Sequence, residues 1–123
     1  LQAHVTGYGK VHRHPFALGE TSDTKHIRLK PDSLVNSLSN EFQGGEYEET
    51  KEISVRTLDA FCEQNGIGHI DVLKTDTEWF DLDVLKGGEN LLKRQGIDFI
   101  ISKSAFRPSD EEQTHFCRLN KCL

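Results

Sequence analysis

The amino-acid sequence predicts an α/β fold in which a parallel sheet is flanked by helices. Two short, nearly continuous apolar segments, residues 70–75 and 97–102, have the length and β-branched content of buried strands. Helical periodicity precedes, separates and follows them, so strands and helices alternate through the second half of the chain. Such a series forms a parallel sheet covered by helices, with right-handed crossovers.

The first half of the chain is less regular and predicts strands at an edge of the sheet. Alternating apolar residues, Gly/Pro/Ser clusters and a run of acids set its expected boundaries. The expected elements are a strand at 10–18, a turn at 19–24, a half-buried edge strand at 26–30, a long loop at 31–45 with a helical turn near its start, and a solvated acidic connector at 46–52.

The second half has clear start and stop signals. Thr57 is a suitable N-cap, and a glycine in the left-handed conformation ends a helix readily. The expected elements are a short strand at 53–55, a helix from Thr57 to Asn65-Gly66, a buried strand at 70–75, a helix interrupted or closely packed at Gly87-Gly88 and ended by Gly96, a buried strand at 97–102, and a last helix that starts after Ser109.

Composition limits the class of protein and its partners. The 123 residues carry a net charge of −5 and 35% hydrophobic residues, which favours one soluble globular domain and disfavours nucleic acid as a partner. No apolar run has the roughly 18 residues that a membrane span requires. Three cysteines in no paired motif predict reduced thiols and a cytoplasmic location. The chain opens with Leu1 rather than Met, so we expect an excerpt or a processed form.

The most informative segment is I-D-V-L-K-T-D-T-E-W-F-D at residues 70–81. It reads as a strand that brings acidic groups to its carboxyl end and then turns into a helix. Ligands bind at that end of the strands in open α/β sheets. Asp76 and Glu78 can therefore orient a substrate hydroxyl or accept its proton. The alternative is that Glu78 and Asp81 stabilise the start of the following helix.

Other side chains have a structural and a functional interpretation. Lys74 is expected to pair with a carboxylate rather than to act as a nucleophile. Trp79 packs or offers a stacking surface, and Asp59 caps its helix or complements its dipole. We expect no metal site, although three candidate ligand groups remain open: Asp76 with Glu78 and Asp81; His12 with His14; and Cys117 with Cys122 and His115.

The segments V-R-T-L-D-A-F at 55–61, L-K-T-D-T-E-W-F-D at 73–81, V-L-K-G-G at 84–88 and D-F-I-I-S at 98–102 together resemble the FkbM-type S-adenosylmethionine-dependent methyltransferases. That family typically shows T-L-D-x-F, then L-K-I-D-x-E-G-x-E, then V-L-x-G. The resemblance runs in register from residue 55 to 101, and residues 16–19 and 36–38 resemble two upstream family segments.

The resemblance implies a class I, Rossmann-like methyltransferase fold, S-adenosylmethionine as cofactor, and methyl transfer to a hydroxyl of a small molecule or glycan. It implies catalytic roles for Asp76 and Glu78 and cofactor contacts from Asp76 and Trp79. It also implies substrate contacts from Lys74 and Asp81.

The chain departs from the family pattern at several positions, and these departures predict a partial domain. Trp79 replaces a glycine, Asp81 replaces a glutamate, and Ser102-Lys103 stands where an acid is common. The glycine-rich loop and ribose-binding acid of class I methyltransferases have no counterpart here. We therefore expect one partial domain, with edge strands and a long loop at 1–56 and a βαβ core at 57–123.

A partial domain predicts weak or absent cofactor binding by this chain alone, even where the parent protein is an enzyme. It also predicts self-association through an exposed sheet. The alternative function is a non-catalytic remnant or interaction module that keeps the half-fold and has lost the cofactor site.

Overall fold

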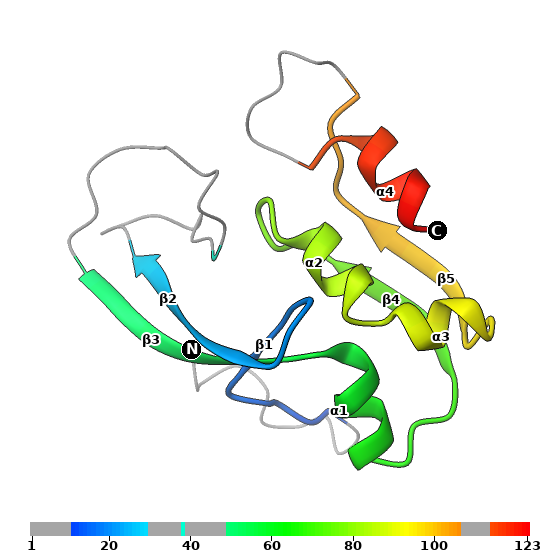
Figure 1. The fold of residues 1–123 in the computed structure, drawn as a ribbon, viewed down its shortest axis with the longest axis horizontal. Helices are drawn as coiled ribbons and strands as arrows, with labels where there is room; N and C mark the ends of the chain where they lie inside the picture. Colours follow the sequence, from blue (N-terminus) through cyan, green and yellow to red (C-terminus); the bar gives the residue numbers. More distant parts are fainter. Residues whose placement is uncertain (1–10, 30–37, 39–48, 107–113) are drawn as a thin grey trace.

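The structure is a computed structural model that describes residues 11–29, 38, 49–106 and 114–123. Strands and helices alternate from residue 49 onward, so the prediction of a mixed α/β fold is confirmed (Figure 1). The elements are β1 (Ala17–Leu18), β2 (Asp23–Leu29), β3 (Glu49–Arg56), α1 (Leu58–Gln64), β4 (Ile70–Thr75), α2 (Asp81–Lys86), α3 (Glu89–Lys93), β5 (Ile97–Ser102) and α4 (Phe116–Cys122).

The strands form two sheets rather than the single parallel sheet that the sequence predicts. One sheet has the order β1-β3-β2, with β1 parallel and β2 antiparallel to β3. The other pairs β4 with β5 in parallel, from Ile70↔Ile97 to Thr75↔Ser102. The parallel pairing of the two apolar strands is thus confirmed at the predicted bounds. The expectation of a wholly parallel sheet is wrong for the part of the chain described, because β2 returns beside β3 as a hairpin-like partner.

The strand predicted at 10–18 is wrong over residues 11–16, and residue 10 lies outside the described residues. Only two residues, at β1, pair with β3. Pro15 has no N–H to donate to a ladder. The rings of His14 and Phe16 instead pack on Phe61 of α1, at centroid distances of 4.9 and 5.5 Å. The alternating pattern at residues 11–16, which predicted a strand, therefore arises from side-chain contacts with α1.

The acidic segment expected as a connector is also wrong where the structure describes it, because residues 49–52 belong to β3. Seven positions of β3 pair with β2, and residues 50–52 stay exposed. Backbone pairing with β2, rather than burial of side chains, therefore holds this segment extended. The edge strand expected at 26–30 is confirmed as β2, which begins earlier, at Asp23. The predicted loop at 31–45, apart from residue 38, lies outside the described residues.

The helix boundaries follow the sequence signals except at the last helix. Thr57 caps α1, its hydroxyl accepting a hydrogen bond from the Ala60 N–H at 3.1 Å, and Gly66 has a φ of 65° just after the helix end. The last helix, α4, begins at Phe116, and the start predicted just after Ser109 lies outside the described residues. His115 precedes α4 and pairs with Ala105 in a short bridge, which keeps residues 114–115 extended.

Two small hydrophobic clusters form the core, and both lie against the β4–β5 sheet. The first cluster centres on Leu58 and Cys62 of α1 and Leu91 of α3. The second joins α2 to α4 through buried leucines. Leu73 of β4 packs against both clusters, so the sheet connects them. The second cluster consists of Leu82, Leu85 and Leu119, with Leu73, Leu92, Ile100 and Cys122 around it.

Among the residues that the structure describes, helices cover one face of the β4–β5 sheet, whereas the sequence predicts helices on both faces. Val72, Phe99 and Ile101 are 54%, 68% and 55% exposed. They alternate along the strands with the residues that face the helices, such as Leu73 and Ile100. In the part of the chain that the structure describes, one face of this sheet is therefore apolar and open.

The Gly87-Gly88 pair separates α2 from α3 and allows close packing, as predicted. A Cβ atom on Gly87 would collide with the carbonyl oxygen of Gly19, and one on Gly88 would lie 2.9 Å from Leu58 Cδ2. The Asp59 carboxylate crosses this junction. It accepts hydrogen bonds from the N–H groups of Asn90 and Leu91 at 2.9 and 3.0 Å. Asp59 thus caps α3 rather than its own helix, α1.

We predict that Gly87→Ala destabilises the fold strongly, because the new methyl group meets backbone atoms that cannot rotate away. Overpacking typically costs about 1–3 kcal/mol. Because the new methyl group would meet the Gly19 backbone, we expect a loss near the upper end of this range. Urea unfolding followed by circular dichroism measures the effect. Gly68→Ala is the matched control, since its Cβ would have no heavy atom within 4 Å. Equal unfolding midpoints for the two variants would contradict the described packing.

Candidate functional site

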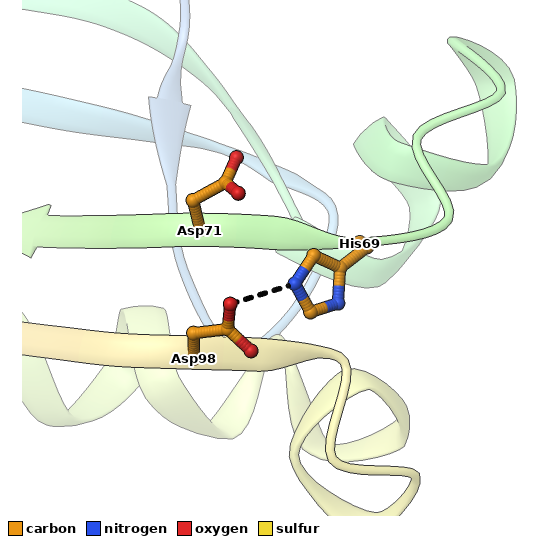
Figure 2. Close-up of side chains that lie close together, drawn as sticks. All are labelled: His69, Asp71 and Asp98. Atoms are coloured by element: carbon orange, nitrogen blue, oxygen red, sulfur yellow. Dashed lines mark ion pairs between the residues drawn. The ribbon is translucent and has the colours of Figure 1, made fainter.

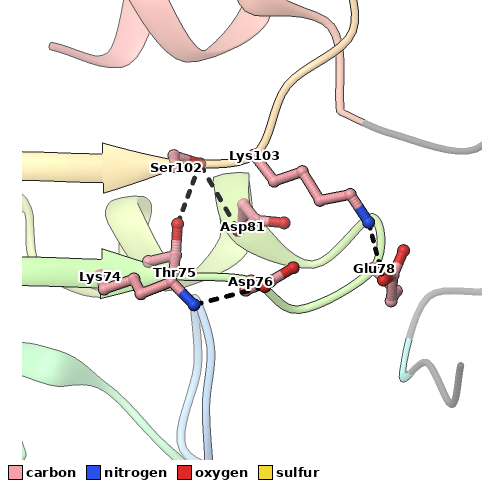
Figure 3. Close-up of polar contacts among 7 residues, drawn as sticks. All are labelled: Lys74, Thr75, Asp76, Glu78, Asp81, Ser102 and Lys103. Carbon is pink, nitrogen blue, oxygen red and sulfur yellow. Dashed lines mark hydrogen bonds and ion pairs between the residues drawn. The ribbon is translucent and has the colours of Figure 1, made fainter. Parts of the chain in front are cut away.

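The carboxyl end of β4 carries an ion pair between neighbouring functional candidates. Lys74 Nζ lies 3.4 Å from Asp76 Oδ2 (Figure 3). The two side chains are 65% and 45% exposed. The predicted pairing of Lys74 with a carboxylate is thus seen in the structure. Asp76 itself presents a partly exposed carboxylate immediately after the strand, where ligands of α/β sheets bind.

A second ion pair links the loop after β4 to the end of β5. Lys103 Nζ lies 3.0 Å from Glu78 Oε1, and the Glu78 side chain is only 17% exposed. The hydrogen bond with Glu78, and the negative charges of Glu78, Asp76 and Asp81, raise the pKa of Lys103. Lys103 therefore stays charged through the neutral range, and the stability that its raised pKa contributes is lost as the pH rises through that pKa.

A chain of hydroxyl groups joins the ends of the two strands to the start of α2. Thr75 Oγ1 donates to Ser102 Oγ at 2.9 Å, and Ser102 Oγ donates to Asp81 Oδ1 at 3.4 Å (Figure 3). Asp81 is fully buried and lies in the first turn of α2. This position agrees with the alternative interpretation that Asp81 stabilises a helix start.

The loop between β4 and α2 has an unusual backbone. Glu78 and Trp79 have φ values of 45° and 77°, in the left-handed region that residues other than glycine rarely adopt. The family motif has glycine at the position of Trp79. The turn therefore keeps a glycine-like conformation with a tryptophan in place, and this strain is typical of backbone held at a functional site.

Three buried polar atoms of this loop and helix start have no hydrogen-bond partner among the residues that the structure describes. They are Thr77 Oγ1, Trp79 Nε1 and Asp81 Oδ2. An unpaired buried polar group costs about 1–3 kcal/mol, so such groups need a bound partner, water or a functional reason. The set includes an indole donor, a carboxylate acceptor and a hydroxyl that can do both.

A cavity of about 280 Å³ opens between the two sheets beside this loop. Its wall is mostly apolar, and Lys74, Thr75 and Thr77 add its few polar groups. A concave, largely apolar space with few polar groups is the usual form of a small-molecule site. The lining residues are Ala17, Leu18, Ile27, Leu38, Leu73, Lys74, Thr75, Thr77, Phe80 and Val84.

A cavity and charged groups at the carboxyl end of a strand form the arrangement in which open α/β sheets generally bind ligands. The family model described as "Methyltransferase FkbM domain" matches residues 3–120. The chain therefore belongs to this methyltransferase family, and the resemblance found in residues 55–101 is confirmed. No curated protein and no solved structure matched the chain. Within the described ranges, no helix is long and apolar enough to cross a membrane.

The structure brings most of the predicted site residues together around Lys103. The negative charges of Asp76, Glu78 and Asp81 all raise the pKa of Lys103. Lys74 forms its ion pair with Asp76. The roles of Asp76, Glu78, Trp79, Lys74 and Asp81 stay predictions, because position alone does not establish them. Among the residues described, the only group of three metal-ligating side chains that converges lies elsewhere, and none of the three groups weighed from the sequence does so.

Sequence reasoning missed the parts of the site that Ser102 and Lys103 supply. It noted them only as a departure from the family. The signal was nonetheless present, because parallel strands place their carboxyl ends side by side. Once residues 70–75 and 97–102 are paired in parallel, Ser102 falls beside Thr75, and Lys103 follows at the same edge.

We predict that Ser102→Ala destabilises the protein, because it removes the donor to Asp81 and leaves a fully buried carboxylate without that partner. An unsatisfied buried group costs about 1–3 kcal/mol. Chemical denaturation at neutral pH gives the difference. Ser54→Ala serves as the control, since Ser54 is exposed on β3. Equal losses in the free energy of unfolding for the two variants would show that the hydroxyl chain does not stabilise the fold.

Proposed function

We propose that this protein is an S-adenosylmethionine-dependent methyltransferase that methylates a hydroxyl group of a small molecule or glycan. The observation that carries the proposal is the Asp76 carboxylate, which stands at the carboxyl end of β4, between two residues that line the cavity. Membership of the FkbM methyltransferase family supports the reaction class. The proposal includes a Rossmann-like sheet for the complete domain, of which β4 and β5 are neighbouring parallel strands.

The cavity suits part of such a cofactor. Its apolar wall matches a planar ring of low polarity, and the unpaired Thr77 hydroxyl can hydrogen-bond a ring nitrogen. The unpaired Trp79 N–H offers one further donor beside the site. We assign cofactor contacts to Asp76 and Trp79 in this arrangement. The cofactor would supply the electrophilic methyl group.

In the proposed reaction the acceptor's oxygen forms a bond to the methyl carbon while the bond from that carbon to sulfur breaks. The hydroxyl proton must leave, and in this proposal the Asp76 carboxylate accepts it. Lys74 holds this carboxylate by the ion pair and provides a second contact for the acceptor. Glu78 is fixed by Lys103, so its catalytic role would be to position groups and to stabilise charge. Asp81 is buried in the present conformation, and its predicted substrate contact therefore requires movement of residues 77–80.

Calorimetric titration with S-adenosylmethionine, followed by transfer of a labelled methyl group to a panel of alcohols and sugars, tests this function. The measurements use residues 1–123 and an N-terminally extended form of the protein. Saturable binding with label found on a hydroxyl supports the proposal. Absence of both binding and transfer in both forms would instead support the non-catalytic interaction module.

In an active form of the protein, we predict that Asp76→Asn lowers turnover about 10²–10⁴-fold, the usual contribution of a positioned general base. Asn keeps the shape of the side chain and removes its basicity. The melting temperature should change little, because Asp76 is partly exposed and holds only a surface ion pair. Specific activity and melting temperature are measured on one preparation.

Asp59→Asn is the matched control for this prediction. Asp59 carries the same side chain but caps α3 through two backbone N–H groups. It should lose thermal stability and keep its activity per folded molecule. Unchanged turnover in Asp76→Asn would remove Asp76 from the catalytic residues and leave the acidic cluster as helix-start electrostatics.

The location of the protein belongs to the same proposal. Cys62, Cys117 and Cys122 are all free thiols. Burial raises the pKa of the Cys62 and Cys122 thiols, which keeps both protonated and weakly reactive. Three unpaired thiols fit a reducing compartment, and we therefore propose the cytoplasm.

We also propose that the open face of the β4–β5 sheet mediates self-association, because it exposes Val72, Phe99 and Ile101 side by side on adjacent strands. Phe99→Lys should shift the protein toward monomer in light scattering after size exclusion, with the fold retained. Val11→Lys is the control, since Val11 is 52% exposed but lies outside this sheet. A strictly monomeric wild-type protein at high concentration would contradict the proposal.

A further inference from the structure

A second cluster of polar side chains lies at the opposite end of the β4–β5 sheet. His69 immediately precedes β4, and Asp71 and Asp98 are the second residues of β4 and β5 (Figure 2). Potential ligand atoms of the three side chains all lie within 4.8 Å of one another. His69 Nε2 is 3.1 Å from Asp98 Oδ2. All three residues are exposed, so an ion can reach them from solvent.

The register of the strands sets the two carboxylates directly against each other. Ile70 pairs with Ile97 and Val72 with Phe99, which places Asp71 opposite Asp98 on the same face of the sheet. Like charges in this position destabilise a pair of strands. His69 Nε2 contacts only one of them. Within the described ranges the Asp71 side chain has no hydrogen bond or ion pair, so nothing described offsets the repulsion on its carboxylate.

The geometry points to a binding site for a divalent transition-metal ion, formed by His69, Asp71 and Asp98. One imidazole nitrogen with two carboxylate oxygens is a donor set that suits Zn²⁺, Co²⁺ or Mn²⁺ better than an oxygen-only ion such as Ca²⁺. Two ligands of one zinc ion stand at most about 4.2 Å apart, because each bond is about 2.1 Å long. Small rotations of exposed side chains close the spacing of 4.8 Å.

This site is independent of the proposed methyltransferase function. Asp76 follows Asp71 by five positions and comes just after the end of β4, which is roughly 16 Å at about 3.3 Å per residue. A metal ion here would bridge the amino ends of β4 and β5 and offset the repulsion between the Asp71 and Asp98 carboxylates. Its expected effect is to stabilise the folded chain by an amount that grows with the logarithm of the free metal concentration.

Titration of residues 1–123 with Co²⁺, in the presence of a phosphine reductant, tests the site. We expect one ion to bind per chain, with visible absorption bands and no intense thiolate charge-transfer band. Zn²⁺ should compete for the site and raise the melting temperature. An intense near-ultraviolet thiolate band would show that the ion sits on Cys117 and Cys122 instead, and would overturn the assignment.

Asp71→Asn is the decisive variant, because Asp71 has no partner whose loss would weaken the metal-free fold. It should hold or raise the melting temperature without metal, since it removes the repulsion, and should lower metal affinity at least tenfold. His69→Ala should lower the affinity similarly, whereas His26→Ala, an exposed histidine on β2, should bind like wild type. Wild-type affinity in both Asp71→Asn and His69→Ala would overturn the proposal, as would the absence of binding by the wild-type chain.

Discussion

Parallel pairing of β4 with β5 determines where every polar group of interest lies. The pairing sets Thr75 beside Ser102 at one end and Asp71 beside Asp98 at the other. At the carboxyl end, the hydroxyl chain and Lys103 draw the loop after β4 toward β5. At the amino end, the same alignment forces two carboxylates together. One register therefore produces both the candidate methyltransferase site and the candidate cation site, because a parallel ladder aligns like ends of its strands.

The junction between α1, α2 and α3 explains why the site can form on such a small core. Asp59 caps α3, and its own N–H donates to the Gly87 carbonyl at 2.9 Å. Gly87 in turn lies against Gly19, which follows β1. These backbone contacts fix α2 relative to β1, and the cavity lies between them. The T-L-D and V-L-x-G segments shared with the family thus correspond to one packing contact rather than to two separate features.

The sequence was most informative where local chemistry decides the structure. The apolar runs of β4 and β5, the Thr57 cap and the Gly66 stop are local signals, and each was predicted at its observed position. Prediction failed where a distant partner decides. Glu52 and its neighbours form part of a strand because they pair with β2. His14 and Phe16 lie outside the sheet, where their rings pack on Phe61. Neither partner is close in sequence.

The same distinction holds for the candidate site. Asp76 and Glu78 were found because a strand followed by acids is visible in one short segment. Lys103 and Ser102 were not, because their relevance arises only when a second strand is aligned with the first. The burial of Asp81 also depends on α2 packing against the sheet, so the sequence offered it as a substrate contact while the structure surrounds it completely.

Trp79 gives the protein a property that the family's glycine does not provide. It is the single tryptophan of the chain, and it lies in the strained loop beside the cavity, with its indole N–H buried. Indole emission responds to the polarity and hydrogen bonding around the ring. The tryptophan fluorescence of this protein therefore originates at the candidate site itself, and it reports on that loop without a label or a substitution.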